Sequence, residues 1–182
     1  MKLHIEIDQS EEGDPAGLSC QETGARQVAR RNIDVLASIL ALELASLYPE
    51  VERQAATTKA SGEISLTFMT PDEIRAINKE HRGIDEPTDV LSFPLWEIDG
   101  AFMPEFFMPG ILPLGDIIIC APEAERLCDT PPLDALCLVL AHGFLHLLAM
   151  DHDTPEKEAE MWKRQDALAA RLLAALNAQE AA

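Results

Sequence analysis

The sequence predicts an α+β fold, a single domain in which a small mixed β-sheet of about four strands packs with about five helices. Two observations support this prediction. Short segments that alternate apolar and polar residues, as strands do, are mixed along the chain with longer segments whose apolar residues recur at helical spacing. In addition, 182 residues are enough for one domain with a hydrophobic core, and no internal repeat or linker is visible. We therefore expect one domain over residues 1–182.

The first part of the chain is expected to form a strand, a loop and a long helix. Residues 3–7 alternate apolar and polar side chains with the period of two that strands show. Residues 10–24 are polar and contain Gly and Pro, which is typical of a loop. The apolar residues of 27–48 fall at helical spacing, and Pro49 is expected to end that helix.

A second strand and a capped helix are expected next. Residues 63–69 alternate Ile, Leu and Phe with polar neighbours. The Thr-Pro-Asp-Glu sequence at 70–73 is typical of a helix start, because Thr and Glu can form a capping box and Pro suits the first turn. We expect this helix to reach Arg82 and to end at Gly83, and we expect a short strand at 90–95.

Residues 97–113 are expected to be a loop insertion. The segment contains several Pro and Gly residues and three aromatic residues that look exposed, Phe102, Phe106 and Phe107. It is either a packed surface loop or a surface that contacts a partner or a substrate, and the sequence leaves both interpretations open.

The C-terminal part is expected to contain a buried strand and three helices. The continuous apolar run at 115–120 predicts a strand buried on both faces, and a short helix is expected at 122–128. The apolar segment 131–150 predicts a helix through the middle of the fold. A Thr-Pro pair opens a last helix that reaches about residue 176, and residues 178–182 are expected to be a frayed tail.

The composition argues against several classes of protein. Apolar residues make up 47% and charged residues 25%, as in ordinary globular proteins. The N-terminus has no signal-peptide pattern, and the longest apolar run is too short for a bilayer, so we expect a cytoplasmic protein without a membrane span. None of the four cysteines forms a C-x-x-C pair, which favours reduced thiols.

The net charge of −18 limits how the protein can meet a nucleic acid. Non-specific nucleic-acid binding comes from Lys and Arg, and a strongly acidic protein repels a polyanion. If RNA is the substrate, either the site is a local positive pocket or a partner delivers the RNA. The acidic excess is also compatible with a solvated surface that aids solubility.

Three of the five histidines lie within eleven residues, at His142, His146 and His152. His142 and His146 are four residues apart in the predicted helix 131–150, so their imidazoles project from one face. His152 can join them only if the helix ends near Ala149 and the chain folds back. Core histidines are the alternative, but three imidazoles in a core would leave several nitrogens to satisfy, so a metal site is favoured.

Three imidazoles around one zinc ion leave a fourth tetrahedral position open, which is typical of catalytic zinc sites. Such a site acidifies a bound water molecule. Residues 1–182 are therefore predicted to be a metal-dependent hydrolase domain with its metal cleft at the end of the central helix. Nickel, copper and iron also accept three histidines.

A zinc protease is disfavoured. The zincin motif places Glu directly after the first histidine as the general base. Gly143 stands at that position and cannot take a proton, although the ligand spacing resembles the extended metzincin pattern.

The histidine segment and two upstream segments resemble a known family. Residues 142–152 read HGFLHLLAMDH, which is similar to the H-G-x-L-H-L-x-G-Y-D-H signature of YbeY-type proteins, the bacterial rRNA maturation factors and metal-dependent endoribonucleases. Residues 78–94, NKEHRGIDEPTDVLSFP, resemble the family's N-x-x-x-R…T-D-V-L-S-F-P segment, and residues 114–117 resemble its L-G-D-I strand. The matches have the family's order and spacing.

The resemblance implies a site and an activity. It implies an α+β fold with one Zn²⁺ per chain, held by His142, His146 and His152 in a cleft, and Arg82 as the catalytic cation of that cleft. It implies single-strand-selective RNA cleavage in 16S rRNA 3′-end maturation and ribosome quality control. The expected partners are single-stranded RNA or rRNA and small-subunit ribosomal proteins, with no DNA and no membrane.

The chain departs from the family signature at two positions before His152. Ala149 stands where Gly is usual and Met150 where Tyr is usual. Gly suits a left-handed turn, and another residue there costs about 1 kcal/mol. Either Ala149 accepts that strain or the turn is built differently, and the loss of Tyr removes a hydroxyl from this neighbourhood.

Other polar residues near these motifs have both a functional and a structural interpretation. Asp151 could orient a ligand imidazole or only shape the turn. Asp89 and Asp116 could act as a general base, although capping is favoured. The candidates for contact with an RNA backbone are Asn78, Lys79, Thr88 and Ser92.

Two functional hypotheses follow. The first is a zinc-dependent endoribonuclease, in which Arg82 holds the phosphate by its bidentate fork and either a water molecule or the ribose 2′-hydroxyl attacks phosphorus. The alternative is a non-catalytic, metal-stabilised ribosome assembly factor that acts through protein contacts, which the acidic charge favours. A hydrolase for another substrate class is a third, weaker hypothesis.

Overall fold

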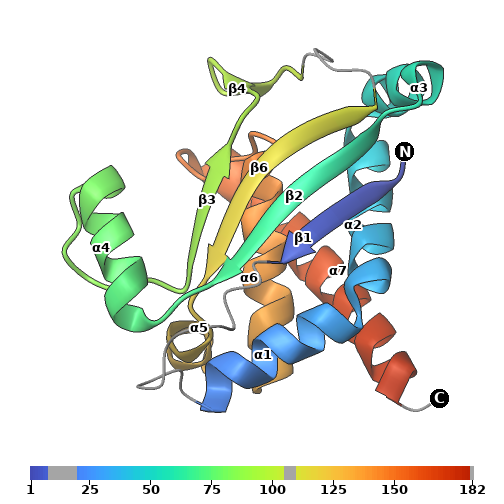
Figure 1. Ribbon diagram of the computed structural model, residues 1–182. Coiled ribbons are helices and arrows are strands. Elements are labelled where there is room, and N and C mark those ends of the chain that lie inside the picture. The colour runs from blue at the N-terminus through green and yellow to red at the C-terminus, as the bar shows by residue number, and fades with distance from the viewer. Residues whose placement is uncertain (8–19, 105–109, 181–182) are drawn as a thin grey trace.

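The structure is a computed structural model, in which residues 1–7, 20–104 and 110–180 are described. This part of the chain forms seven helices and six strands (Figure 1). In chain order they are β1 (Leu3–Ile7), α1 (Cys20–Arg31), α2 (Ile33–Leu47), α3 (Pro49–Thr58), β2 (Ser61–Phe68), α4 (Pro71–Arg82), β3 (Val90–Pro94), β4 (Glu97–Ile98), β5 (Ala101–Phe102), β6 (Ile111–Ile119), α5 (Ala121–Cys128), α6 (Pro132–Leu147) and α7 (Pro155–Glu180).

A mixed four-stranded sheet with the order β1-β2-β6-β3 forms the centre of the fold. β1, β2 and β6 are parallel, and β3 runs antiparallel to β6. β4 and β5 form a separate two-stranded hairpin. The predicted fold class, a small α+β domain with a mixed sheet of four strands, is confirmed. The described residues contain more helices than the five that we expected.

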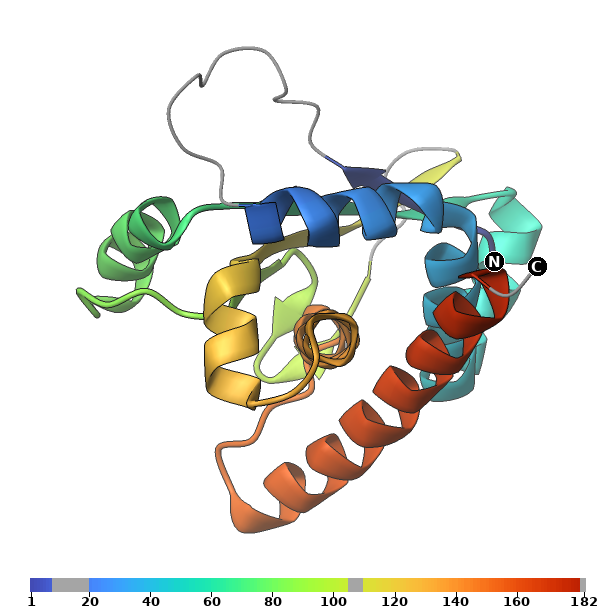
Figure 2. The same cartoon turned by 90° about the horizontal axis from the view of Figure 1, so that it is seen from below.

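The helices cover one face of the sheet more fully than the other. Ser92 of β3 and Ile117 of β6 pair in register, and both approach Gly143 of α6. This face is therefore the one that packs on α6, and Figure 2 shows α6 end-on with α1, α5 and α7 around it. Because side chains alternate along a strand, the next pair, Phe93 and Asp116, points to the opposite face.

The opposite face is covered at its β3 end by α4. Ile74 of α4 is fully buried against Leu91, Ile118 and Cys120 of the sheet and its edges. Thr70 and Glu73 form the predicted capping box, and Gly83 ends the helix with a left-handed φ of 74°. The local signals read from the sequence therefore fix both ends of the helix that presents Arg82.

The helix α6 runs through the middle of the fold, as predicted. Ten of its sixteen residues are buried. A Cβ at Gly143 would lie 3.0 Å from Ile117 Cγ2 and 3.0 Å from Ser92 Oγ, so a side chain at this position would press on the sheet. Glycine thus permits close approach of α6 to β3 and β6, and a side chain here would require its neighbours to shift by a few tenths of an ångström.

The helix predicted over 27–48 is wrong in its extent. It consists of α1 and α2, which are separated at Asn32, and α1 begins at Cys20, inside the predicted loop 10–24. The Asn32 side chain donates to the Val28 carbonyl at 2.9 Å, as polar residues do at helix ends. Pro49 does follow the end of α2, but it also opens α3, where its missing N–H is not needed. Residues 10–19 lie outside the described residues.

The loop predicted over 97–113 contains regular structure. Asp99 and Gly100, with φ values of 51° and 73°, form a two-residue turn between β4 and β5, and both positive φ values are typical of a type I′ hairpin. Phe102, which looked exposed, is buried at 7% exposure. The strand β6 begins at Ile111, four residues before the predicted start. Phe106 and Phe107 lie outside the described residues.

The remaining predicted elements agree with the structure to within a few residues. Thr154 Oγ1 accepts from the backbone N–H of Lys157 at 3.3 Å and so caps the last helix. That helix continues to Glu180, so residues 178–180 of the predicted frayed tail are helical, and 181–182 lie outside the described residues. Cys128 and Cys137 are free thiols.

Within the described ranges, no helix is by itself long and apolar enough to cross a membrane. The helices α5 and α6 reach that length and composition only as a pair, and they are bent by 100° at their junction.

Candidate metal centre

The turn after α6 brings His152 back to the helix. Met150 N–H donates to the Leu145 carbonyl at 3.1 Å, and Ala149 N–H donates to the His146 carbonyl at 3.0 Å. These two bonds are the Schellman motif that ends many helices. Ala149 occupies the left-handed position with a φ of 57°. Of the two possibilities that the sequence left open, Ala149 therefore accepts the strained conformation in place of Gly.

A hydroxyl from a distant helix junction holds the same turn. Tyr48, between α2 and α3, donates its hydroxyl to the Leu148 carbonyl at 2.8 Å. Its ring packs on Phe102 of the hairpin, with centroids 4.7 Å apart. Sequence analysis missed this contact, because Tyr48 and Leu148 are one hundred residues apart and no local pattern joins them.

The three imidazoles converge. One ring nitrogen from each of His142, His146 and His152 lies within 4.8 Å of the others. The Nε2 atoms of His142 and His146 are 3.0 Å apart. His142 and His146 are half-buried and His152 is exposed. The structure therefore brings together the three residues that the sequence singled out.

Burial keeps the two helical histidines neutral at pH 7. Burial, together with the neighbouring rings of His142 and His152, lowers the pKa of His146 to about 4. Burial also lowers the pKa of His142, although the hydrogen bond that its ring makes to Gln165 Oε1 acts in the opposite direction. Neutral imidazoles offer the nitrogen lone pairs that a metal ion needs.

The helix α7 supplies two contacts to these rings that sequence analysis missed. Gln165, which is buried, places Oε1 2.8 Å from His142 Nδ1. Trp162 lies stacked near His142 and His152, with ring centroids 5.7 Å and 5.4 Å away. A weak signal was present, because Trp162 and Gln165 are three residues apart and share one face of a helix.

Arg82 lies with the histidines. It is the last residue of α4, and its side chain lines a cavity of about 290 Å³ together with the three histidines. The strand β3 and the loop before it form another wall. The other residues that line this cavity are Thr88, Asp89, Val90, Ser92 and Asp151. Arg82 is the one arginine or lysine among these described lining residues.

The two acidic residues that line the cavity, Asp89 and Asp151, accept hydrogen bonds from the main chain of its walls. Asp89 Oδ1 accepts from the Thr88 hydroxyl at 3.0 Å and from the Val90 N–H at 2.9 Å. Asp151 Oδ1 accepts from the backbone N–H of His152 at 2.8 Å, which is the turn-shaping role. Each of these carboxylates already accepts a hydrogen bond that shapes the main chain.

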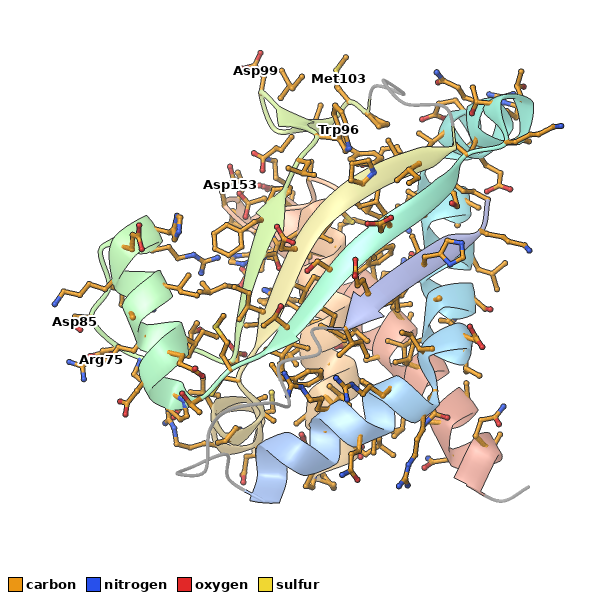
Figure 3. All side chains as sticks on the ribbon, viewed as in Figure 1. Arg75, Asp85, Trp96, Asp99, Met103 and Asp153 are labelled. Atoms are coloured by element: carbon orange, nitrogen blue, oxygen red, sulfur yellow. The ribbon has the colours of Figure 1, made fainter. Side chains whose placement is uncertain are left out.

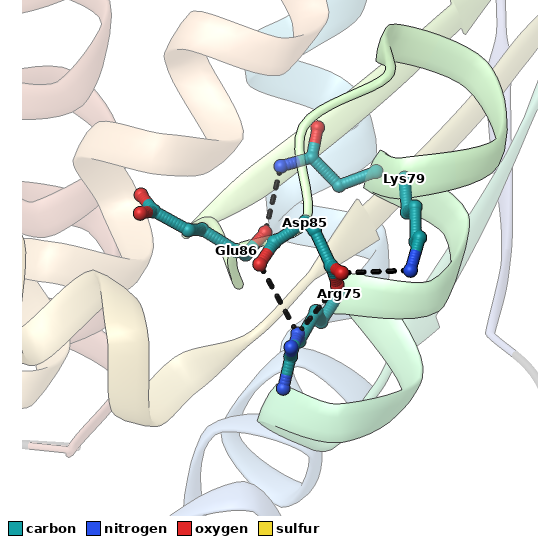
Figure 4. A network of polar contacts seen from close by, with 5 residues as sticks. Arg75, Lys79, Asp85 and Glu86 are labelled. Atoms are coloured by element: carbon teal, nitrogen blue, oxygen red, sulfur yellow. Dashed lines mark hydrogen bonds and ion pairs between the residues drawn. The ribbon is translucent and has the colours of Figure 1, made fainter.

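Three other candidates lie away from the cavity. Asp116 points to the opposite face of the sheet from α6. Asn78 is buried and donates to the Glu86 carbonyl at 2.8 Å. Lys79 pairs with Asp85 at 2.7 Å, and Arg75 pairs with the same carboxylate (Figure 4). Asn78 thus stabilises the loop after α4, and Asp85 holds Lys79 and Arg75.

A second cavity continues from the first toward the hairpin. It has a volume of about 510 Å³ and is bounded by β4, the β4–β5 turn and the start of α7. Figure 3 shows Asp99 and Met103 at the hairpin and Asp153 near β3. The acidic residues that line it are Glu97, Asp99, Asp151 and Asp153, and the basic ones are Arg82 and Lys157. The ion pair between Lys157 and Asp153, at 2.8 Å, leaves this side acidic.

The fold and the site together define a small α+β protein with a three-histidine candidate metal site beside a single arginine. The comparisons with known proteins agree. The sequence profile of Endoribonuclease YbeY matches residues 28–173. An Endoribonuclease YbeY of Lysinibacillus sphaericus is 37% identical over 147 residues, which are 77% of this chain and 85% of that protein. One of Shouchella clausii is 42% identical over 118 residues, covering 62% of this chain and 74% of the other.

The chain belongs to the YbeY endoribonuclease family, whose members are hydrolases that act on RNA. A solved structure shows the same fold. The solution structure of a Thermotoga maritima protein superposes with a TM-score of 0.51 at 21% identity, covering 97% of this chain and 93% of that one.

Proposed function

We propose that this chain is a zinc-dependent endoribonuclease that cleaves single-stranded RNA. His142, His146 and His152 are the metal ligands, and Arg82 is the catalytic cation. One observation carries the proposal: three imidazoles and one guanidinium line the same cavity in a member of an endoribonuclease family.

The donor set fits zinc. The nitrogens lie within 4.8 Å of one another, close enough for one ion with Zn–N distances of about 2.0–2.1 Å after small shifts. The lowered pKa values of His142 and His146 keep both rings available at pH 7. A bound divalent ion supplies Lewis acidity, which polarises a phosphate oxygen or acidifies a water molecule.

The chain's own residues bind and orient the phosphate. Arg82 offers a bidentate fork that matches two phosphate oxygens and stabilises the charge that develops on them. Because four carboxylates line the neighbouring cavity, an RNA backbone is repelled on the hairpin side. A site with so little positive surface favours a single strand held at one phosphate, with little base readout.

The biological role that we propose is 16S rRNA 3′-end maturation and ribosome quality control in the cytoplasm. Family membership supports this role. The proposed substrate is single-stranded RNA or rRNA.

Cleavage of a labelled single-stranded RNA tests the proposed activity. Arg82→Ala should lower kcat by about 10²–10³-fold, as removal of a transition-state charge stabiliser does. Arg75→Ala is the matched control, because Arg75 lies on the same helix and pairs with Asp85 outside the cavity. Equal cleavage by wild type and Arg82→Ala would contradict the catalytic role of Arg82, and equal cleavage by His146→Ala as well would show that a contaminating nuclease causes the activity.

The products distinguish the nucleophiles. A 5′-phosphate with a 3′-hydroxyl shows attack by water, and a 2′,3′-cyclic phosphate shows attack by the ribose 2′-hydroxyl. Duplex RNA of the same sequence should be cut more slowly if the cavity selects single strands.

A second function has its own supporting observation. The acidic cavity beside the hairpin and the net charge of −18 suit a basic protein, which supports a non-catalytic assembly factor that contacts small-subunit ribosomal proteins. Chelation separates the two functions. Metal-free protein that stays folded and loses cleavage supports the enzyme, whereas unfolding on chelation without any cleavage by the metal-loaded protein supports the assembly factor.

A further inference from the structure

We infer that Gln165 is a positioning residue for the metal site, whose amide oxygen holds the His142 proton on Nδ1 and so turns the Nε2 lone pair toward His146 and His152. The inference rests on the proposed function, because it matters only if His142 is a metal ligand. It concerns a residue of α7, outside the histidine segment and outside the cavity lining.

The geometry places Gln165 behind the His142 ring. Oε1 of Gln165 lies 2.8 Å from Nδ1 of His142, and Gln165 is only 7% exposed. On the other side of the ring, Nε2 of His142 lies 3.0 Å from Nε2 of His146. Nδ1 of His142 therefore contacts a buried acceptor, and Nε2 faces the histidine cluster.

The tautomer follows from these contacts. A neutral imidazole carries one proton, so the nitrogen that donates to a neighbour cannot also bind a metal ion. An amide oxygen only accepts, so the contact requires the proton on Nδ1. The lone pair then lies on Nε2, which is the nitrogen that faces His146. The opposite tautomer would direct an N–H at His146 and block the ion.

A second contact from the same helix face restricts the ring further. Trp162 lies one turn before Gln165 and is stacked near the His142 ring at an interplanar angle of 23°. Asp151, the carboxylate next to His152, accepts from the backbone N–H of that residue. Gln165 therefore differs from Asp151, because its acceptor faces a ligand ring and not the main chain. A buried partner of this kind changes metal affinity by about 10–100-fold.

Three variants isolate the acceptor. Gln165→Met keeps the length of the side chain and removes the acceptor, whereas Gln165→Glu, as the ionised carboxylate, keeps oxygens that only accept. Gln54→Met makes the same exchange on exposed α3 and serves as the matched control. Thermal unfolding confirms that each variant is folded.

Two readouts that do not depend on cleavage test the inference. Two-bond ¹H–¹⁵N spectra of the metal-free protein at pH 7.5 report which nitrogen of His142 carries the proton. Competition with a chromophoric chelator gives the dissociation constant for Zn²⁺. We expect the Nδ1–H tautomer in wild type, Gln165→Glu and Gln54→Met. We expect Gln165→Met to lose this tautomer preference and to bind Zn²⁺ about 10–100-fold more weakly.

Either of two results would overturn the inference: an unchanged His142 tautomer in Gln165→Met, or equal weakening of Zn²⁺ binding by Gln165→Met and Gln165→Glu. Failure of the proposed function gives a different result. Wild-type protein that binds no Zn²⁺ contradicts the metal site, while the spectra of the metal-free variants still report on the tautomer.

Discussion

The left-handed backbone of Ala149 is the point at which a single residue decides whether His152 reaches the other two histidines. Its φ of 57° is one that Gly adopts freely and Ala does not. The Schellman bonds of the turn hold it there. The conformation costs about 1–2 kcal/mol for a residue with a Cβ, so the turn lowers the stability of the domain in return for the geometry of the site.

Ala149→Gly should therefore stabilise the protein by about 1 kcal/mol, after the greater entropy of Gly in the unfolded chain is subtracted. Urea denaturation measures the change. The matched control is Ala159→Gly, at an exposed position in the second turn of α7, which should destabilise by about 1 kcal/mol. A loss of stability at position 149 equal to that at 159 would contradict the left-handed turn.

The pKa of His146 gives a second prediction at this scale, for stability against pH. Its pKa is about 4 in the folded protein and 6.5 in a free side chain. Below pH 6.5 the His146 ring becomes protonated in the unfolded chain, whereas in the folded protein it becomes protonated only near pH 4. Stability of the metal-free protein should therefore fall as the pH is lowered through this window, and the lowered pKa of His142 adds to the loss.

Urea midpoints at pH 7 and pH 5 measure this loss, and His146→Gln should reduce it. The exposed carboxylates of Asp85 and Asp153 titrate in another window, because their pKa values are lowered from 3.8. Their contribution is present above that value and is lost only at more acid pH. An identical loss between pH 7 and pH 5 in wild type and His146→Gln would contradict the assignment.

Among the helices and strands, those with local signals were predictable. The capping box at Thr70 and the glycine at position 83 mark both ends of α4, and the i, i+4 spacing of His142 and His146 requires only a helix. The Asp99-Gly100 dipeptide is also a local signal, because Asp-Gly is typical of a two-residue hairpin turn. The prolines around it nevertheless led us to predict a loop. The boundary between α1 and α2 could not be predicted, because the helical spacing of apolar residues continues across Asn32.

The contacts between elements could not be predicted. Gln165 reaches His142 only because α7 packs along α6, and Tyr48 reaches Leu148 only because the α2–α3 junction lies beside the end of α6. The Tyr48 contact leaves no periodicity or motif in the sequence, and the sign of the Gln165 contact is a weak one, the i, i+3 spacing of Trp162 and Gln165 on one helix face. Arg82 entered the prediction through the family resemblance, since a lone arginine at a helix end more often forms a surface ion pair.

Tyr48→Phe tests the link between the hairpin, α2 and the turn. It removes the hydroxyl that donates to the Leu148 carbonyl and keeps the ring that packs on Phe102. We expect a loss of about 1 kcal/mol in unfolding free energy and faster amide hydrogen exchange at residues 148–152. Ser38→Ala removes an exposed hydroxyl bond within α2 and should leave that exchange unchanged. Exchange that is the same in Tyr48→Phe and wild type would show that the hydroxyl does not hold the turn.

At the scale of the whole molecule, the protein carries a net charge of −18, and the histidine cavity contains one arginine, Arg82, among its lining residues. The hairpin side of the site is acidic, while Arg75 and Lys79 on α4 are held by Asp85. We expect such a protein to bind RNA weakly outside its site, so the proposed cleavage would rely on the metal ion and Arg82 to attract the phosphate.

The central claim is that three imidazoles hold one metal ion, and the metal content of purified protein tests it most directly. Inductively coupled plasma mass spectrometry should find about one divalent ion per wild-type chain, as three converging histidines predict. His146→Ala should lose the ion, whereas His4→Ala, which removes an exposed histidine of β1, should keep it. Wild-type protein without metal after zinc loading, or His146→Ala with a full equivalent, would contradict the account.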